Sequence, residues 1–285
     1  MRLHLHKMIV TWNKRSFYMS GYLVKNLTNY VKGVMSKNTS AVFLFDGRSG
    51  LGKTTLSSQV GCFINQECKK YMDKVRVFCL DDMAWTPDIF IEKLKKAKKG
   101  DVIILDESMI LSNRSTMSEI NRMIIIMMSM IRSKQIFVIF NVNSIFDLDK
   151  NLPLHRADML CHLYAEDDKF ASRGRYGVVP SAKGKLKDLY INGKKYYDYS
   201  KARYAFRDKF TPFFPFSEKE YEKRKQKDIA DYFSQKKTTS SQYKISRDLG
   251  ICYLKKEYGL SPEEIGEIFK IGRATVFRVL KETST

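Results

Sequence analysis

The residues with the clearest chemical meaning lie in one glycine-rich segment early in the chain. This segment matches the pattern G-x-x-x-x-G-K-[ST] and comprises Gly47, Arg48, Ser49, Gly50, Leu51, Gly52, Lys53 and Thr54. Glycine lets the backbone curl so that its N–H groups point inward at a phosphate, and a helix that starts there adds partial positive charge. In such a loop Lys53 reaches the β- and γ-phosphates, and the Thr54 hydroxyl ligates Mg²⁺. The segment, extended by Thr55, therefore predicts a binding site for ATP and Mg²⁺.

Two carboxylates supply the second part of this chemistry. The apolar run Val102–Leu105 ends in Asp106 and Glu107. Asp106 is expected to hold the Mg²⁺ shell, and Glu107 to polarise the attacking water as the general base. An Asp–Glu pair can also be no more than the polar end of a strand. Its position beyond a phosphate-binding loop, in the same predicted sheet, favours the catalytic interpretation.

These residues must be positioned by alternating strands and helices. Short apolar runs predict strands at 8–12, 41–45, 75–80, 102–105, 136–140 and 159–164, and helical patterns cover 18–35, 53–70, 86–99 and 115–132. Continuous apolar strands that alternate with helices predict an α/β fold, with a parallel sheet covered on both faces. Such a sheet binds its ligand beyond the carboxyl ends of its strands, where the candidate residues lie.

The two motifs together resemble those of P-loop ATPases of the ASCE class, which carry a catalytic glutamate beside the metal-binding aspartate. The resemblance implies a polar sensor at the end of the next strand, for which Asn141 is the candidate; the alternative is an asparagine that only forms a turn. Such ATPases often form homo-oligomeric rings in which a neighbour's arginine completes the site. Arg156 is the candidate for that role, with Arg132 and Arg114 as alternatives.

Residues 101–164 look like the FtsK–HerA translocases and the zonula-occludens-toxin-like ATPases of phages and mobile elements. The AAA+ branch is favoured less, because the basic, aromatic-rich stretch after residue 168 is unlike that branch's helical lid. The resemblance implies an ATPase core at 1–168 that acts as a motor or switch on DNA. The alternatives are an ATP-regulated DNA-binding protein without motor activity, and a toxin-like assembly ATPase.

The charge balance supports a nucleic-acid partner. The chain has 51 Lys and Arg against 31 Asp and Glu, a net charge of +20, which favours polyanions such as DNA, although a lysine-rich surface alone would give the same excess. Residues 169–216 interleave lysines with aromatics, and Asn192-Gly193 predicts a β-hairpin there. Lys183, Lys185 and Lys187 are the candidate contacts with DNA phosphates. Residues 217–242 are expected to form a charged helix and linker.

The C-terminal residues 243–285 are expected to form a compact helical domain. Ser261, Pro262 and Glu264 form a capping box at a helix start, and a second helix begins near Arg273. The expected buried face consists of Ile265, Ile268, Phe269, Ile271, Val276, Val279 and Leu280. The unit resembles the helix-turn-helix of resolvases, which implies that Arg273, Thr275 and Arg278 face DNA bases. A helical hairpin for protein contacts is the alternative.

The remaining composition bears on the compartment. The five cysteines include no C-x-x-C pair, which is typical of a reducing cytosol and argues against a disulfide framework or zinc site. No apolar run approaches the ~20 residues that cross a bilayer. We therefore expect a soluble protein in the cytoplasm of a prokaryote or of a virus-infected host cell.

Overall fold

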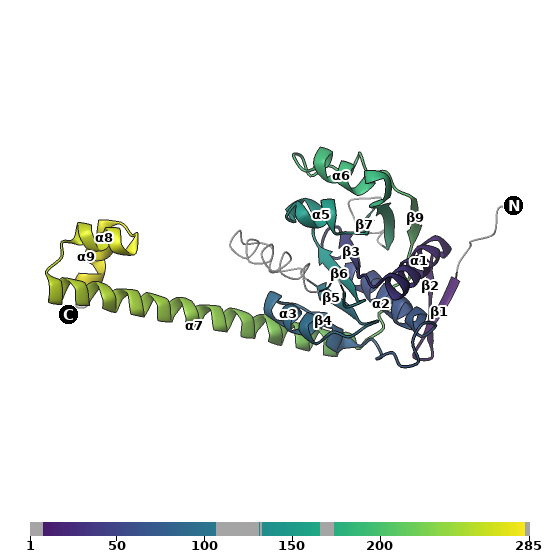
Figure 1. The fold of residues 1–285 in the computed structure, drawn as a ribbon, viewed down its shortest axis with the longest axis horizontal. Coiled ribbons are helices and arrows are strands. Elements are labelled where there is room, and N and C mark those ends of the chain that lie inside the picture. The colour runs from purple at the N-terminus through teal and green to yellow at the C-terminus, as the bar shows by residue number, and fades with distance from the viewer. Residues whose placement is uncertain (1–7, 107–130, 132, 166–173, 283–285) are drawn as a thin grey trace. The chain divides into compact units, whose positions relative to one another are not determined.

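The computed structural model describes residues 8–106, 131, 133–165 and 174–282, and Figure 1 shows its elements. The chain divides into two compact units, residues 1–225 and 226–285. The predicted helix at 115–132 lies almost wholly outside the described residues.

The first unit is built on a seven-stranded sheet with the order β4-β5-β6-β3-β7-β8-β9. The strands are β3 (Ala41–Asp46), β4 (Met83–Ala84), β5 (Val102–Asp106), β6 (Phe137–Val142), β7 (Met159–Tyr164), β8 (Arg175–Pro180) and β9 (Phe206–Lys209). The strands from β4 to β7 run parallel, whereas β8 and β9 extend the sheet with antiparallel pairing. The predicted α/β fold with a mostly parallel sheet is confirmed.

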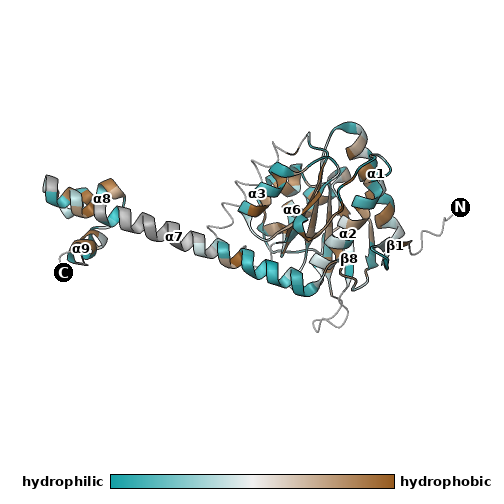
Figure 2. Cartoon of the chain, turned by 90° about the horizontal axis from the view of Figure 1, so that it is seen from below, coloured by the Kyte–Doolittle hydropathy of each residue, from teal (hydrophilic) through white to brown (hydrophobic). Residues whose placement is uncertain are grey.

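The central strands are apolar because both faces of the sheet are covered. Every residue of β3, β5 and β6 is buried, and Figure 2 shows these apolar strands inside the unit. Because β6 lies between β3 and β5, Asn141 pairs in register with Phe45 on one side and Asp106 on the other. The polar ends of the strands therefore meet at one edge of the sheet.

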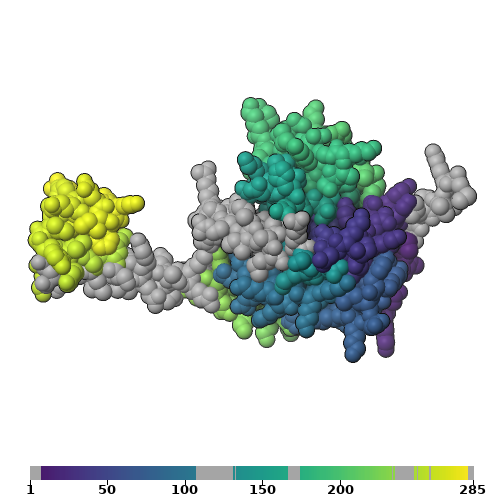
Figure 3. Space-filling view, in the orientation of Figure 1, coloured from purple at the N-terminus to yellow at the C-terminus, as the bar shows by residue number. Residues whose placement is uncertain are grey.

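Helices pack around this sheet, and a small hairpin precedes them. Among the described residues, the helices that lie wholly in the first unit are α1 (Gly21–Lys37), α2 (Lys53–Cys68), α3 (Pro87–Lys96), α5 (Asn151–His155) and α6 (Lys185–Gly193), and the hairpin consists of β1 (Met8–Trp12) and β2 (Arg15–Met19). In the described part of this unit, short 3₁₀ turns lie at Leu80–Asp82, Ile145–Asp147 and Ala182–Gly184. Helix α3 starts close to the predicted residue 86, with Thr86 as its cap and Pro87 in its first turn. In Figure 3 the residues of α5 and α6, teal and green, lie together, consistent with their direct contact.

The predicted strand at 75–80 is wrong. Val77 is 51% exposed, and the chain turns into the 3₁₀ segment Leu80–Asp82 before it forms the edge strand β4. The Asp82 carboxylate accepts a 2.8 Å hydrogen bond from the Cys79 N–H and so stabilises this turn. Local side-chain capping therefore outweighs the apolar pattern.

The predicted β-hairpin at Asn192-Gly193 is also wrong, because these residues end helix α6. Leu186, Leu189 and Tyr190 are buried at helical spacing. Gly193 is needed for close packing, since a Cβ there would lie 2.4 Å from the Asp198 carbonyl oxygen. The antiparallel strands of the 169–216 stretch are instead β8 and β9, which join the central sheet.

Helix α7 (Glu218–Tyr258) is continuous, although a helix followed by a linker was predicted for 217–242. Its residues after 225 form the second unit together with α8 (Pro262–Phe269) and α9 (Arg273–Glu282). The core of this unit contains Ile251, Ile265, Val276 and Val279. Of the predicted buried residues, Ile268 is an exception, because it is 56% exposed.

Candidate nucleotide site

The glycine-rich loop joins β3 to α2 at the carboxyl edge of the sheet. Gly47, Gly50 and Gly52 all have positive φ angles, of 136°, 83° and 93°. Such angles favour glycine, and at Gly47 a Cβ would also lie 2.4 Å from the carbonyl oxygen of Leu163. Helix α2 begins at Lys53, so its first N–H groups face the loop. This is the backbone geometry that a phosphate requires.

Lys53 points back into the loop. Its side chain is buried, and Nζ donates to the carbonyl oxygens of Gly47 at 2.5 Å and Arg48 at 3.1 Å and to Oδ1 of Asn143 at 3.3 Å. Burial lowers the pKa of Lys53, while the charges of Asp106 and Asp46 oppose that shift. The Lys53 ammonium therefore lies inside the loop, where a bound phosphate would replace the two carbonyl oxygens as its partner.

Asp106 is the centre of a buried hydrogen-bond network. Its Oδ1 accepts from Thr54 Oγ1 and from Asn141 Nδ2, each at 3.0 Å, and its Oδ2 accepts from the Tyr221 hydroxyl. Asn141 Nδ2 also donates to Ser57 Oγ at 2.9 Å. The network joins α2, β5, β6 and the first turns of α7.

The predicted residues around Asp106 suit Mg²⁺. Mg²⁺ takes oxygen ligands, and in nucleotide sites it uses one or two protein oxygens together with phosphates and waters. The Thr54 hydroxyl and the Asp106 carboxylate supply these oxygens side by side. No cluster of three or more His, Cys, Asp and Glu side chains that could hold a metal occurs among the described residues. Thr54 and Asp106 would therefore hold the ion together with the nucleotide.

Tyr221 has no counterpart among the sequence predictions. It is buried, and burial, followed by the nearby Asp106 charge, raises its pKa. The hydroxyl therefore stays protonated and donates to Asp106. A lone tyrosine in a highly charged helical stretch carries no sequence signal for this role, because the contact joins residues that lie far apart in the chain.

A second buried carboxylate, Asp46, lies directly before the loop. It is fully buried, and it accepts from His162 Nδ1 at 2.8 Å, from the Ile145 N–H at 3.1 Å and from the Tyr199 hydroxyl. The rings of His162 and Tyr199 stack with centroids 3.9 Å apart. This cluster, which sequence analysis missed, ties the start of the loop to β7 and to the segment after α6. Its only sequence signal is a carboxylate at the end of an apolar strand.

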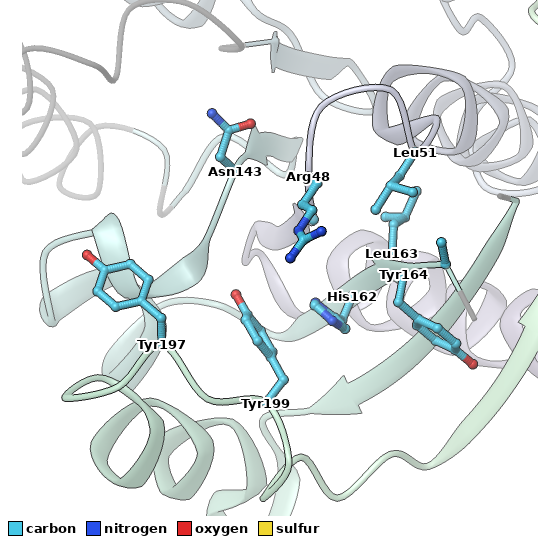
Figure 4. A pocket seen from close by; sticks show the side chains of 10 residues that line it. Arg48, Leu51, Asn143, His162, Leu163, Tyr164, Tyr197 and Tyr199 are labelled. Carbon is cyan, nitrogen blue, oxygen red and sulfur yellow. The ribbon is translucent and has the colours of Figure 1, made fainter. Parts of the chain in front are cut away.

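A pocket of about 340 Å³ opens beside the loop. Its lining consists of Gly47, Arg48, Leu51, Asn143, His162, Leu163, Tyr164, Ala165, Tyr197 and Tyr199. Figure 4 shows the Arg48 side chain among the rings of His162, Tyr197 and Tyr199. The pocket thus adds aromatic surface and a guanidinium to the phosphate-binding loop.

The candidate base and the candidate arginine fingers do not lie in the described nucleotide site. Glu107, Arg114 and Arg132 lie outside the described residues. Arg156 is exposed and precedes β7, at the opposite edge of the sheet from the loop that follows β3. It does not belong to the site of its own chain, and its role in a neighbour's site stays a prediction.

In the second unit, the capping box of Ser261 and Glu264 is present. Lys270 has a φ of 53° in the turn between α8 and α9, where glycine is common. Arg273 is exposed, pairs with Glu263 at 2.6 Å and lies over the Phe277 ring. Thr275 and Arg278 follow it on α9.

In the first unit Lys183 and Lys187 are exposed, and Lys185 starts α6. Contact of these residues with DNA stays a prediction.

The Asp46 cluster yields a test of what holds the loop. Asp46→Asn should lower the free energy of unfolding by about 2–3 kcal/mol, because an amide keeps only one of the two acceptor oxygens and cannot accept from donors on both sides as the carboxylate does. Asp147→Asn is the matched control, since it affects an exposed aspartate–tyrosine hydrogen bond, to Tyr197, and should cost less than about 1 kcal/mol. Urea unfolding of both variants checks this. Equal losses would show that the cluster does not contribute beyond a surface contact.

Comparison with known proteins agrees with this geometry. The family model for AAA, the ATPase family associated with various cellular activities, matches residues 43–163, from β3 to β7. No curated protein and no solved structure matches the chain. None of the described helices is both long and apolar enough to span a membrane. The match is to the branch that the sequence pattern favoured less; the FtsK–HerA, toxin-like and resolvase-like resemblances stay predictions. The match to the AAA ATPase family model, with the fold and the loop, supports a P-loop NTPase domain at residues 43–163.

Proposed function

We propose that this chain hydrolyses Mg²⁺-bound ATP and uses the cycle to act on DNA, as a motor or switch of a virus or mobile element. The observation that carries the ATPase part is the meeting of Thr54, Asn141 and Asp106 at the end of the glycine-rich loop. A loop with a purely structural role would have no need of a buried carboxylate and a buried lysine side by side at the start of a helix.

The residues divide the work in a simple way. The loop N–H groups and Lys53 bind the phosphates, while Thr54 and Asp106 hold the metal ion, which supplies neutralising charge when bound. Glu107 follows Asp106 directly and is our candidate for the base that takes the proton of the attacking water. Asn141 lies against Asp106 and keeps one buried amide oxygen without a partner in the described structure. That oxygen is free to orient the water.

Support for DNA comes from charge and from the second unit. The net charge of +20 favours a polyanion. The α8–α9 pair, with its capping box and short turn, has the form of a helix-turn-helix. The protein would work in the cytoplasm of a prokaryote or of a virus-infected host cell, where both ATP and DNA are present. In this proposal the protein forms a homo-oligomeric ring, and Arg156 of each chain completes the nucleotide site of its neighbour.

Turnover is the first test. The full chain should hydrolyse ATP, and double- or single-stranded DNA should stimulate it. Lys53→Ala should lose nucleotide binding, whereas Glu107→Gln should bind ATP but turn it over at least ~100-fold more slowly, because only the base is removed. Phosphate-release assays with and without DNA measure this. ATP-dependent DNA binding without turnover would instead identify a regulator, and normal turnover by Glu107→Gln would contradict the assignment of the base.

DNA binding should divide between the two basic regions. Arg273→Ala or Arg278→Ala should reduce the preference for a specific site by roughly 1–3 kcal/mol if the lost contact is bidentate to guanine. Neutralising Lys183, Lys185 and Lys187 together should weaken binding to every sequence and flatten its salt dependence. Titrations against a preferred and a scrambled duplex at several salt concentrations separate these effects. Site preference that survives both arginine substitutions would exclude α9 as the reader.

A further inference from the structure

The first turns of α7 bring two side chains into the nucleotide site. Tyr221 and Lys225 are four residues apart and therefore lie on one face of the helix. The Tyr221 ring packs against Trp85, at 5.6 Å between centroids, and against Phe214, at 5.3 Å. Its hydroxyl donates to Asp106, so this helix face lies directly beside the proposed metal position.

Lys225 extends this contact toward the phosphates. Its Nζ donates to the Tyr221 hydroxyl at 3.2 Å and lies 5.4 Å from the centre of the Tyr221 ring. The ammonium is therefore two hydrogen bonds from Asp106. Burial is the main cause that lowers the pKa of Lys53, and the nearby charge of Lys225 lowers it further.

Two ammonium groups on one side of a buried site repel each other when no anion is bound. The start of α7 is also held by contacts that do not involve Lys225. The Arg224 guanidinium contacts Asp81 of the 3₁₀ turn and pairs with Glu220 at 2.6 Å. A helix held in this way presents a cation to the site in advance of any ligand, as preorganised phosphate binding requires.

The position also suggests which phosphate is bound. The N–H groups at the start of α2 and Lys53 serve the phosphates that lie over the loop. Lys225 approaches instead from Asp106 and Tyr221, on the side where the metal and the attacking water meet the terminal phosphate. We propose that Lys225 is a ligand of the terminal phosphate of bound ATP, carried by α7 and aimed by Tyr221. This inference rests on the proposed function, namely that the loop binds ATP.

The test is a comparison of triphosphate and diphosphate binding by the full chain. Lys225→Met keeps an apolar stem and removes the charge. Its affinity for Mg²⁺-bound ATPγS should fall about tenfold, or about 1.4 kcal/mol, while its affinity for ADP should change by less than about twofold. Lys223→Met is the matched control, because Lys223 is exposed on the same turn and points elsewhere, and should change neither affinity. Isothermal titration calorimetry measures both ligands.

Two further variants separate aiming from folding. Lys225→Arg should retain most of the ATPγS affinity, and Tyr221→Phe should lose about threefold, because the ammonium keeps its charge but loses its hydrogen-bond partner. Thermal unfolding without nucleotide should give the same midpoint for Lys225→Met, Lys223→Met and the unmodified chain. Equal losses for ATPγS and ADP, or no loss for either, would overturn the role of Lys225. An unmodified chain that binds neither nucleotide would overturn the proposed function itself.

Discussion

The buried carboxylate of Asp106 is the interaction on which the first unit depends. A carboxylate in the interior is costly unless hydrogen bonds replace its water. Here the replacements come from Thr54 on α2, Asn141 on β6 and Tyr221 on α7. Satisfying one charge therefore fixes the position of three elements that are distant in sequence, and it places them around the glycine-rich loop.

The strand order explains why this can happen. Because β6 separates β3 from β5, the loop after β3 and the Asp106 carboxylate at the end of β5 lie on either side of Asn141. On the other side of β3, Asp46 accepts from His162 of β7 and from Tyr199. The loop thus lies between two buried carboxylates, one directed to the metal and phosphates and the other to the scaffold. Both sets of donors sit at the carboxyl edge of the sheet, as expected for an α/β ligand site.

Short-range patterns were enough to predict the loop, the strands β3, β5, β6 and β7, the start of α3 and the capping box of α8, because each depends on neighbouring residues. The errors arose where tertiary packing decided the outcome. Asn192-Gly193 signals a hairpin locally, yet Leu186, Leu189 and Tyr190 gain more by burial on one face of α6. The contacts of Tyr221, Tyr199 and His162 join residues more than a hundred positions apart, so no local pattern could reveal them.

The central claim is that one nucleotide site includes both the glycine-rich loop and the start of α7. Hydrogen–deuterium exchange of the full chain, with and without Mg²⁺-bound ATPγS, measures both segments in one experiment. The account predicts slower exchange of backbone amides at residues 47–54 and also at residues 218–225 when the nucleotide is present. Protection confined to 47–54, with exchange at 218–225 unchanged, would contradict it.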